Sequence, residues 1–325
     1  MLLGAFLRNL RLHWPEGRIA VLAEPAYTDV LALNPDVDEI LPMPGTRTGW
    51  LNFAWRVRRA GFTHVFNFDN TEGTALITRL SGAAFRLGLH HGGYRLKLAG
   101  AYTHRVNDPN DRHESRPITE YYLTALEPAG IPIASREVRL VPRAADLEKL
   151  SRFVGAGGRR VLLVHPGSRS PWRVWPADRF AAVCDRVQEE LDAQVVLVGG
   201  PADRQTVDEI RRLAKLHVLT LQEPMSIPRF AALSRLSALL LCHDSGPMHV
   251  AAAVGTPVVA LYGSQNSVLF RPAGDHHILV QPPLPCTDCV APERCAPMDS
   301  YHNLCVQRNT VATVFAAVAA QWQRR

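Results

Sequence analysis

Lysine is scarce in this sequence of 325 residues, although the net charge is +6. Lys97, Lys149 and Lys215 are its lysines, so arginine carries nearly all of the positive charge. An arginine-rich solvated surface accounts for this balance, and so does attraction to a phosphate-bearing partner such as a nucleotide or an anionic membrane face. No basic run is dense enough for a nucleic-acid-binding arm, and no nucleic-acid-binding motif is present. Nucleic acid is therefore not an expected partner.

Long apolar runs are also lacking, since none approaches the roughly 18–20 residues needed to cross a bilayer. The opening apolar segment reaches Arg8 early and has no basic segment ahead of it, so no signal peptide is expected. A hydrophobic content of 47% and a charged content of 20% are typical of a globular protein with a sizeable core. We expect a cytoplasmic protein of two domains.

Several cofactor and metal motifs are missing. The stretch GAGGRR at 155–160 lacks the last glycine of GxGxxG, GxxxxGK[ST] does not occur, and His113-Glu114 does not begin an HExxH. A nicotinamide dehydrogenase and a P-loop kinase are thus disfavoured, and no cofactor is predicted.

Four of the six cysteines gather near the C-terminus: Cys286, Cys289, Cys295 and Cys305. They could form a four-cysteine metal site, but the second pair lacks the CxxC spacing that such sites usually have. Reduced structural cysteines are the alternative, and no metal site is predicted.

Strands and helices alternate along the chain, which predicts an α/β protein with parallel sheets. We expect two Rossmann-like domains, residues 1–154 and 155–325, joined by a glycine-rich hinge at Gly155–Gly158. Ligands of such sheets bind at the carboxyl ends of strands, so two facing domains predict an interdomain cleft.

The first domain opens on a helix, residues 2–14, where a doubly wound sheet would have a central strand. We therefore expect the first strand of this domain to be missing, which would leave two other strands with unpaired edges.

One candidate site is the strand-to-helix junction at 161–180. After the apolar run that ends at Val164, Pro166-Gly167-Ser168 make a turn, and Arg169 and Arg173 follow. Backbone amides, a hydroxyl and two guanidinium groups suit a diphosphate. An ordinary β–α turn with surface arginines is the alternative.

A second candidate site follows the apolar run 237–242, where Asp244, Ser245 and Gly246 precede a helix that ends at Gly255. Asp244 or Ser245 could simply cap that helix, but a cap leaves His243 and His249 unexplained. A carboxylate at this place suits sugar hydroxyls, and the helix amides suit phosphate.

The segments NPDVDEILPMPG, HPGSRSPWRVWPADRFAAV, VVLVGGPADR and above all DSGPMHVAAAVGTPVVALYG resemble glycosyltransferase family nine, the ADP-heptose:lipopolysaccharide heptosyltransferases. The resemblance implies a GT-B architecture and an inverting, metal-independent heptose transfer to an anionic, lipid-linked acceptor of the lipopolysaccharide inner core. It also implies peripheral contact with the inner membrane face.

By the same resemblance, Ser168 contacts the donor phosphates, and Arg173 stands where the family usually has a lysine. Asp244 matches the acid that holds the donor sugar. The remaining donor-binding candidates are Gly167, Arg169, Ser245, Gly246, Met248 and His249.

Family members begin with a strand and a Gly-Asp loop whose aspartate is the general base, and this sequence starts after that point. We expect the coding start to lie upstream. Asp69, at the end of the expected strand THVFNFD, is the base candidate in the sequence as given. A non-catalytic nucleotide-sugar-binding protein, a related GT-B enzyme that uses another nucleotide sugar, and a hydrolase-like or epimerase activity remain as alternatives.

Overall fold

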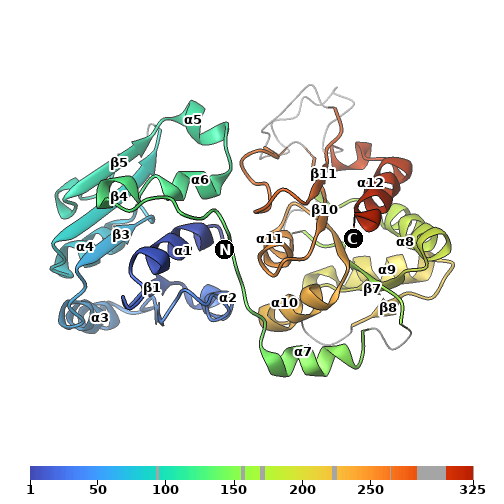
Figure 1. Ribbon diagram of the computed structural model, residues 1–325, viewed down its shortest axis with the longest axis horizontal. Coiled ribbons are helices and arrows are strands. Elements are labelled where there is room, and N and C mark those ends of the chain that lie inside the picture. The colour runs from blue at the N-terminus through green and yellow to red at the C-terminus, as the bar shows by residue number, and fades with distance from the viewer. Residues whose placement is uncertain are drawn as a thin grey trace. The chain divides into compact units, whose positions relative to one another are not determined.

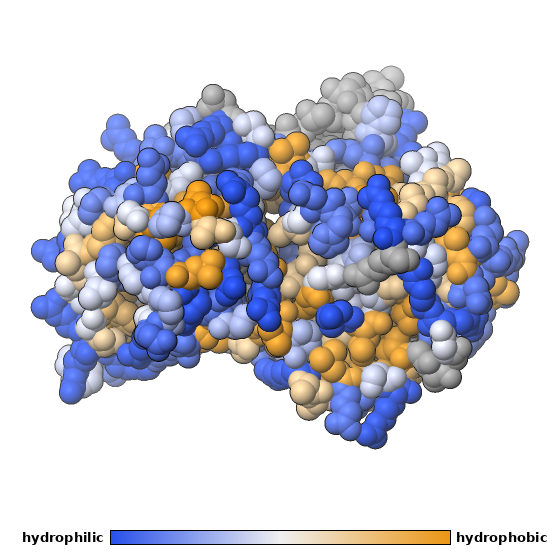
Figure 2. Space-filling view, viewed as in Figure 1, coloured by the Kyte–Doolittle hydropathy of each residue, from blue (hydrophilic) through white to orange (hydrophobic). Residues whose placement is uncertain are grey.

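The computed structural model describes residues 1–92, 95–154, 158–168, 173–221, 225–263, 265–283 and 305–324, apart from the side chains at 47, 48, 110 and 111. Two compact units share the chain, an N-terminal unit of Leu2–Val138 and a C-terminal unit that begins at Arg139 (Figure 1). Each has parallel strands and covering helices, as the alternating sequence pattern predicts. The surface visible in Figure 2 mixes hydrophilic and hydrophobic side chains over both units. None of the helices in the described ranges is long and apolar enough to cross a bilayer.

The N-terminal unit contains two separate parallel sheets. In one, β1 (Ala20–Ala23) pairs with β2 (Glu39–Pro42), and in the other β4 (Phe85–His91) lies between β3 (His64–Asn67) and β5 (His104–Asp108). Its α-helices are α1 (Gly4–His13), α2 (Thr28–Leu31), α3 (Arg47–Arg59), α4 (Glu72–Leu80), α5 (Asn110–Glu114) and α6 (Ile118–Leu123). Within the described residues β4 pairs with two strands, and β1, β2, β3 and β5 each pair with one.

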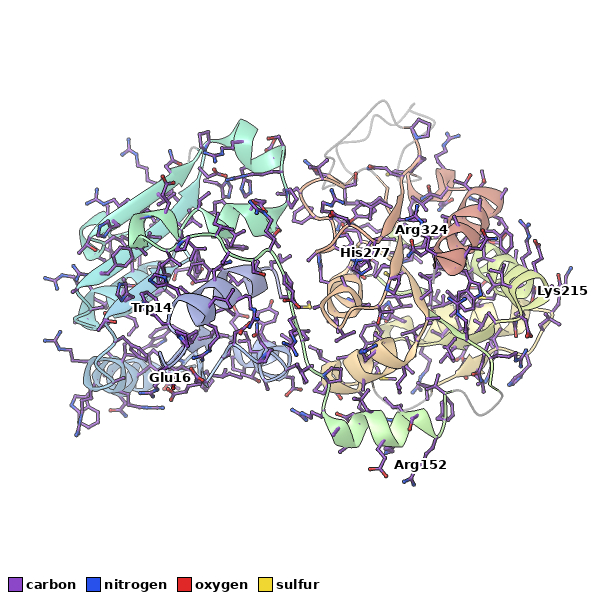
Figure 3. The ribbon with its side chains drawn as sticks, in the orientation of Figure 1. Trp14, Glu16, Arg152, Lys215, His277 and Arg324 are labelled. Carbon is purple, nitrogen blue, oxygen red and sulfur yellow. The ribbon has the colours of Figure 1, made fainter. Side chains whose placement is uncertain are left out.

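A single core joins α1 to both sheets. The ring of Phe6 packs edge-on against Phe66 and Phe68, with centroids 5.0 and 4.9 Å apart. At the end of α1, Trp14 lies against His64 with a centroid distance of 4.7 Å (Figure 3). The buried amide of Asn9 donates to the Ser135 carbonyl at 2.7 Å, so the last segment of the unit is held to its first helix.

The C-terminal unit has one six-stranded parallel sheet in the order β11-β10-β9-β6-β7-β8. Its strands are β6 (Val161–His165), β7 (Gln194–Leu197), β8 (Leu219–Thr220), β9 (Leu239–His243), β10 (Val258–Leu261) and β11 (Ile278–Val280). The α-helices are α7 (Ala144–Ser151), α8 (Ala177–Leu191), α9 (Arg204–Leu213), α10 (Ile227–Leu236), α11 (Gly246–Ala253) and α12 (Val311–Gln323).

The central strands are apolar except at some of their end residues, because both faces of this sheet are covered. Leu162 and Val164 of β6 join one core cluster with side chains of α8, α9 and α12, whereas Leu163 lies outside that cluster although it is fully buried. Successive strand residues point to opposite faces, so Leu163 packs on the other side of the sheet. A continuous apolar run is the sequence pattern of such a strand.

The two units divide at Val138 and Arg139, earlier than the expected boundary at 154 and 155. The reason is that α7 packs against α10, and the Leu140 amide donates to the Ala253 carbonyl at 2.8 Å. Of the expected hinge, residues 155–157 lie outside the described residues.

Candidate functional site

The two candidate segments follow adjacent strands at the middle of the six-stranded sheet. From β6 the chain continues to β7 on one side, while β9 and β10 lie on the other side of β6. Loops that leave neighbouring strands in opposite directions open a crevice at the carboxyl ends, where α/β sheets bind their ligands. Gly167 and Ser168 follow β6, and Asp244 to Gly246 follow β9. The fold therefore brings the two predicted segments to one edge of the sheet.

His243, the last residue of β9, joins the two segments. Its ring is fully buried, and its Nε2 accepts a hydrogen bond from the Trp175 amide at 2.9 Å. On the other side Nδ1 donates to the Gly167 carbonyl at 3.3 Å. Burial lowers the pKa of His243 to about 3, so the ring is neutral and can donate through one nitrogen while it accepts through the other. Capping of the following helix gave His243 no role in the sequence analysis. In the structure, its two hydrogen bonds fix the loop after β6.

Gly167 lies directly against Asp203, at the end of the loop after β7. A Cβ on Gly167 would lie 2.0 Å from the Oδ1 of Asp203, so no other residue fits here without moving that side chain. Asp203 is held in place because its Oδ2 accepts from the Gly200 amide at 2.8 Å. The turn that the sequence predicts at Gly167 is thus fixed by a neighbouring loop as well as by its own backbone.

Asp244 and Arg173 place opposite charges at this edge. The Oδ2 of Asp244 lies 3.9 Å from an Nη of Arg173, and the side chains are 10% and 30% exposed. Burial raises the pKa of Asp244 to about 6, and the nearby guanidinium of Arg173 opposes that rise. At neutral pH the carboxylate is ionised, partly desolvated and able to accept hydrogen bonds from hydroxyl groups.

The first turn of α11 presents its amides beside Asp244. Ser245 stands at the N-cap, yet its side chain makes no capping hydrogen bond and instead donates to the His243 carbonyl at 3.2 Å. A capping role for Ser245 is therefore wrong, and the positive end of the helix has no side-chain cap from this residue. Met248 is buried, with its Sδ 3.5 Å from the Tyr262 hydroxyl. His249 is half-buried, and burial lowers its pKa to about 4.

Two residues at this edge were missed by sequence reasoning, His165 and Asp203. The Nε2 of His165 lies 3.9 Å from the Oδ2 of Asp203, and burial lowers the pKa of this histidine. The run GGPAD after an apolar strand could have indicated a role for Asp203 in the site. The same run is equally typical of the start of the next helix.

A further contact that sequence reasoning missed ties the C-terminal segment to the site loop. The buried indole of Trp175 donates from Nε1 to the backbone carbonyl of Asn309 at 2.8 Å, and the side-chain Nδ2 of Asn309 donates to the Tyr262 carbonyl at 3.0 Å. The loop after β6 is thus anchored by Asn309, which lies more than a hundred positions further along the chain.

Asp69 belongs to the N-terminal unit, where it follows β3. Its side chain is exposed, its Oδ2 accepts from the Thr71 hydroxyl at 3.1 Å, and its amide donates to the Asn67 side chain at 2.9 Å. Every other described candidate lies in the C-terminal unit.

Some candidates lie outside the described residues, namely Arg169, Cys286, Cys289 and Cys295. Cys305 is described and buried. Across the described ranges, no group of three or more histidine, cysteine, aspartate or glutamate side chains is placed to hold a metal ion.

Comparison with known proteins relates most of the chain to one family. Residues 50–298 match glycosyltransferase family 9 (heptosyltransferase). Lipopolysaccharide heptosyltransferase 3 of Escherichia coli (strain K12) is 27% identical over 285 residues, which cover 82% of this chain and 79% of that protein. The crystal structure of a family 9 glycosyl transferase from Veillonella parvula DSM 2008 has a TM-score of 0.82 at 21% identity and covers 100% of this chain and 94% of its own. E. coli ADP-heptose LPS heptosyltransferase II gives a TM-score of 0.77 at 21% identity, with coverages of 99% and 95%. These two structures share the α/β architecture of two Rossmann-like domains that the sequence predicts.

Proposed function

The chain belongs to glycosyltransferase family 9, and we propose that it transfers a heptose from ADP-heptose to an anionic, lipid-linked acceptor of the lipopolysaccharide inner core. One observation carries the proposal: Asp244 and Arg173 lie 3.9 Å apart, beside the loop that begins at Gly167 and the first turn of α11. A sugar diphosphate needs both kinds of group, since its hydroxyls suit a carboxylate and its phosphates suit a guanidinium group and backbone amides.

In the proposed complex, the donor diphosphate lies at the loop after β6. Gly167 and Ser168 offer backbone amides and a hydroxyl, Arg173 offers its guanidinium group, and Arg169 is a further candidate from the same motif. The positive end of α11 adds the amides near Gly246. Ser245, Met248 and His249 complete the donor-binding candidates.

The family resemblance implies an inverting transfer without a metal ion, and we assign its steps to these residues as follows. An acceptor hydroxyl oxygen attacks the anomeric carbon of the heptose as the bond from that carbon to the diphosphate oxygen breaks, so that the anomeric configuration inverts. The hydroxyl proton passes to a base, for which Asp69 is the candidate in this chain, and ADP departs with the electron pair of the broken bond. Arg173 and the loop amides stabilise the charge on the departing diphosphate without a metal ion, and Asp244 orients the sugar.

The lipid-linked acceptor also bears on the location of the protein in the cell. A lipid-linked oligosaccharide resides in a membrane, so we propose a cytoplasmic protein that makes peripheral contact with the cytoplasmic membrane face. Neither nucleic acid nor a cofactor is part of the proposal.

The test is ADP release from ADP-heptose in the presence of a heptose-deficient lipopolysaccharide acceptor. Arg173→Met should lower kcat about 100-fold, as for the loss of one donor to a developing oxyanion, and Arg173→Lys should keep part of the rate. Asp244→Ala should abolish donor binding. Arg204→Met, an exposed arginine of α9, is the matched control and should leave kcat unchanged.

Either of two results would contradict the proposal and favour an alternative function. Thermal stabilisation by ADP-heptose without transfer, even with an N-terminally extended chain, would favour a non-catalytic nucleotide-sugar-binding protein. Faster transfer from another nucleotide sugar would assign a different donor to the same site.

A further inference from the structure

Helices α3 and α4 lie side by side in the N-terminal unit (Figure 1). Phe53 and Val57 of α3 and Ile77 of α4 are buried together in one apolar cluster, which defines the inner side of both helices. This packing settles which residues of each helix face away from the sheet.

The outward sides of both helices carry large apolar side chains. Leu51 and Trp55, one turn apart on α3, are 74% and 59% exposed, and Leu76 and Leu80, one turn apart on α4, are 50% and 44% exposed. Single exposed apolar residues are ordinary, but two pairs on the outer sides of neighbouring helices form a patch. We call Leu51, Trp55, Leu76 and Leu80 the outer apolar face.

The two helices that bear this face also carry exposed positive charge. Helix α3 contains four arginines and no acidic residue, and Glu72 at the start of α4 is the single acidic residue of the two helices. Arg56, Arg58 and Arg59 of α3 and Arg79 of α4 are exposed, and none of the four forms an ion pair within the described part of the chain. The guanidinium carbon of Arg59 lies 4.6 Å from the centre of the Trp55 ring, so positive charge directly adjoins the apolar side chains.

We propose that the outer apolar face and its arginines dock on the anionic surface of a phospholipid bilayer. Tryptophan is favoured at the headgroup level, leucine side chains enter the boundary of the acyl chains, and exposed arginines bind lipid phosphates. A second copy of this chain is a poorer occupant, because a symmetric contact would bring the exposed arginines of two copies together.

The inference rests on the proposed function, since a membrane-docked enzyme suits a lipid-linked acceptor. Membrane docking and heptosyl transfer can nevertheless be tested separately. Vesicle binding requires neither the donor nor the acceptor sugar, and transfer to a lipid-free core oligosaccharide requires no vesicle.

The test is co-sedimentation of the full chain with vesicles of pure phosphatidylcholine or of an equal mixture of phosphatidylcholine and phosphatidylglycerol. We expect binding to the mixed vesicles that weakens at high salt. The double variants Leu51→Ser/Trp55→Ser and Arg56→Glu/Arg59→Glu should each bind at least about tenfold more weakly. Unfolding temperatures check that the variants fold, and transfer to a lipid-free acceptor should not change.

Matched controls keep the test specific. Tyr27→Ser/Val141→Ser removes two exposed apolar side chains elsewhere, and Arg211→Glu/Arg212→Glu reverses two neighbouring charges on α9. Both should bind vesicles as the unaltered chain does. Equal losses in the controls, or no binding of the unaltered chain to mixed vesicles, would overturn the proposal. So would a dimer that Leu51→Ser/Trp55→Ser converts to a monomer without any vesicle binding, since the face would then join two copies.

Discussion

The Nδ1 of His243 lies 3.3 Å from the carbonyl oxygen of Gly167, so the end of β9 holds the loop that follows β6. The same ring accepts a hydrogen bond from the Trp175 backbone amide, so it binds that loop at two points. The two halves of the candidate site, which the sequence places 76 positions apart, are joined by one neutral side chain.

His243→Leu keeps the apolar bulk of the ring but leaves the Trp175 amide and the Gly167 carbonyl without their partner. We expect the free energy of unfolding to fall by about 2 kcal/mol, as for buried polar groups that lose a hydrogen bond. Affinity for ADP should also fall, because the loop that carries Ser168 and Arg173 loosens. Denaturant unfolding and calorimetric titration with ADP measure the two effects.

Ser237→Ala is the control, since it removes a buried hydrogen bond of 2.7 Å to the Leu233 carbonyl away from the site. It should lower stability and leave ADP affinity unchanged. If His243→Leu lost stability alone, the histidine would have no part in donor binding.

The raised pKa of Asp244 predicts that the stability of the protein depends on pH. Its pKa rises from 3.8 to about 6 on folding, so the native state binds this proton more tightly than the unfolded state. The contribution of Asp244 to the free energy of unfolding should therefore decrease as pH rises from about 4 to about 6, and stay at its lowest level above that. The full change is about 3 kcal/mol at most, from the size of the shift.

Urea unfolding of the unaltered chain and of Asp244→Asn across this range isolates the effect, because the other titrating groups cancel in the difference. Asp208→Asn on α9, whose side chain is 59% exposed, is the control and should show no such difference. A difference curve that is flat between pH about 4 and about 6 would refute the assigned shift. Donor-dependent activity should fall as pH drops below about 6, because the sugar then meets a protonated acid.

Gly167→Ala tests the contact with Asp203. The added methyl group would lie 2.0 Å from the Asp203 carboxylate, so we expect a loss of about 1–3 kcal/mol in the free energy of unfolding and weaker ADP binding. Adding Asp203→Gly should recover part of both losses, and a double-mutant cycle over the two positions should show strong coupling.

Gly45→Ala provides a matched control, because a Cβ there has no atom within 4 Å. Additive effects of Gly167→Ala and Asp203→Gly would show that the two residues do not meet.

Much of the fold follows from local sequence pattern. The runs that form β6, β7, β9 and β10 are apolar because both faces of their sheet are covered. Such runs can be recognised in the sequence alone. The helix α6 is short, because it starts only after Pro117 and ends before the turn at Glu127–Ala129. Helix α7 has Leu150 as its one buried residue, and so little apolar periodicity that no prediction covered it.

The site was predicted in part. Ser168, Arg173 and Asp244 could be named because hydroxyl, guanidinium and carboxylate groups follow apolar runs at turn residues, a pattern that is local in the chain. Asp203 and Trp175 could not be named, because each acquires its role from a neighbour in another loop or in the C-terminal segment.

Residue type and short-range spacing are enough to predict the two α/β units, the strands that lead into the site and the chemical groups after them. The tertiary structure was needed to show that His243 binds the Gly167 loop, that Asp203 excludes a side chain at Gly167, and that two exposed apolar pairs lie on helices α3 and α4, which pack against each other. Those relationships depend on which strands and helices become neighbours, and strand order is set by the packing of the whole unit rather than by any single segment.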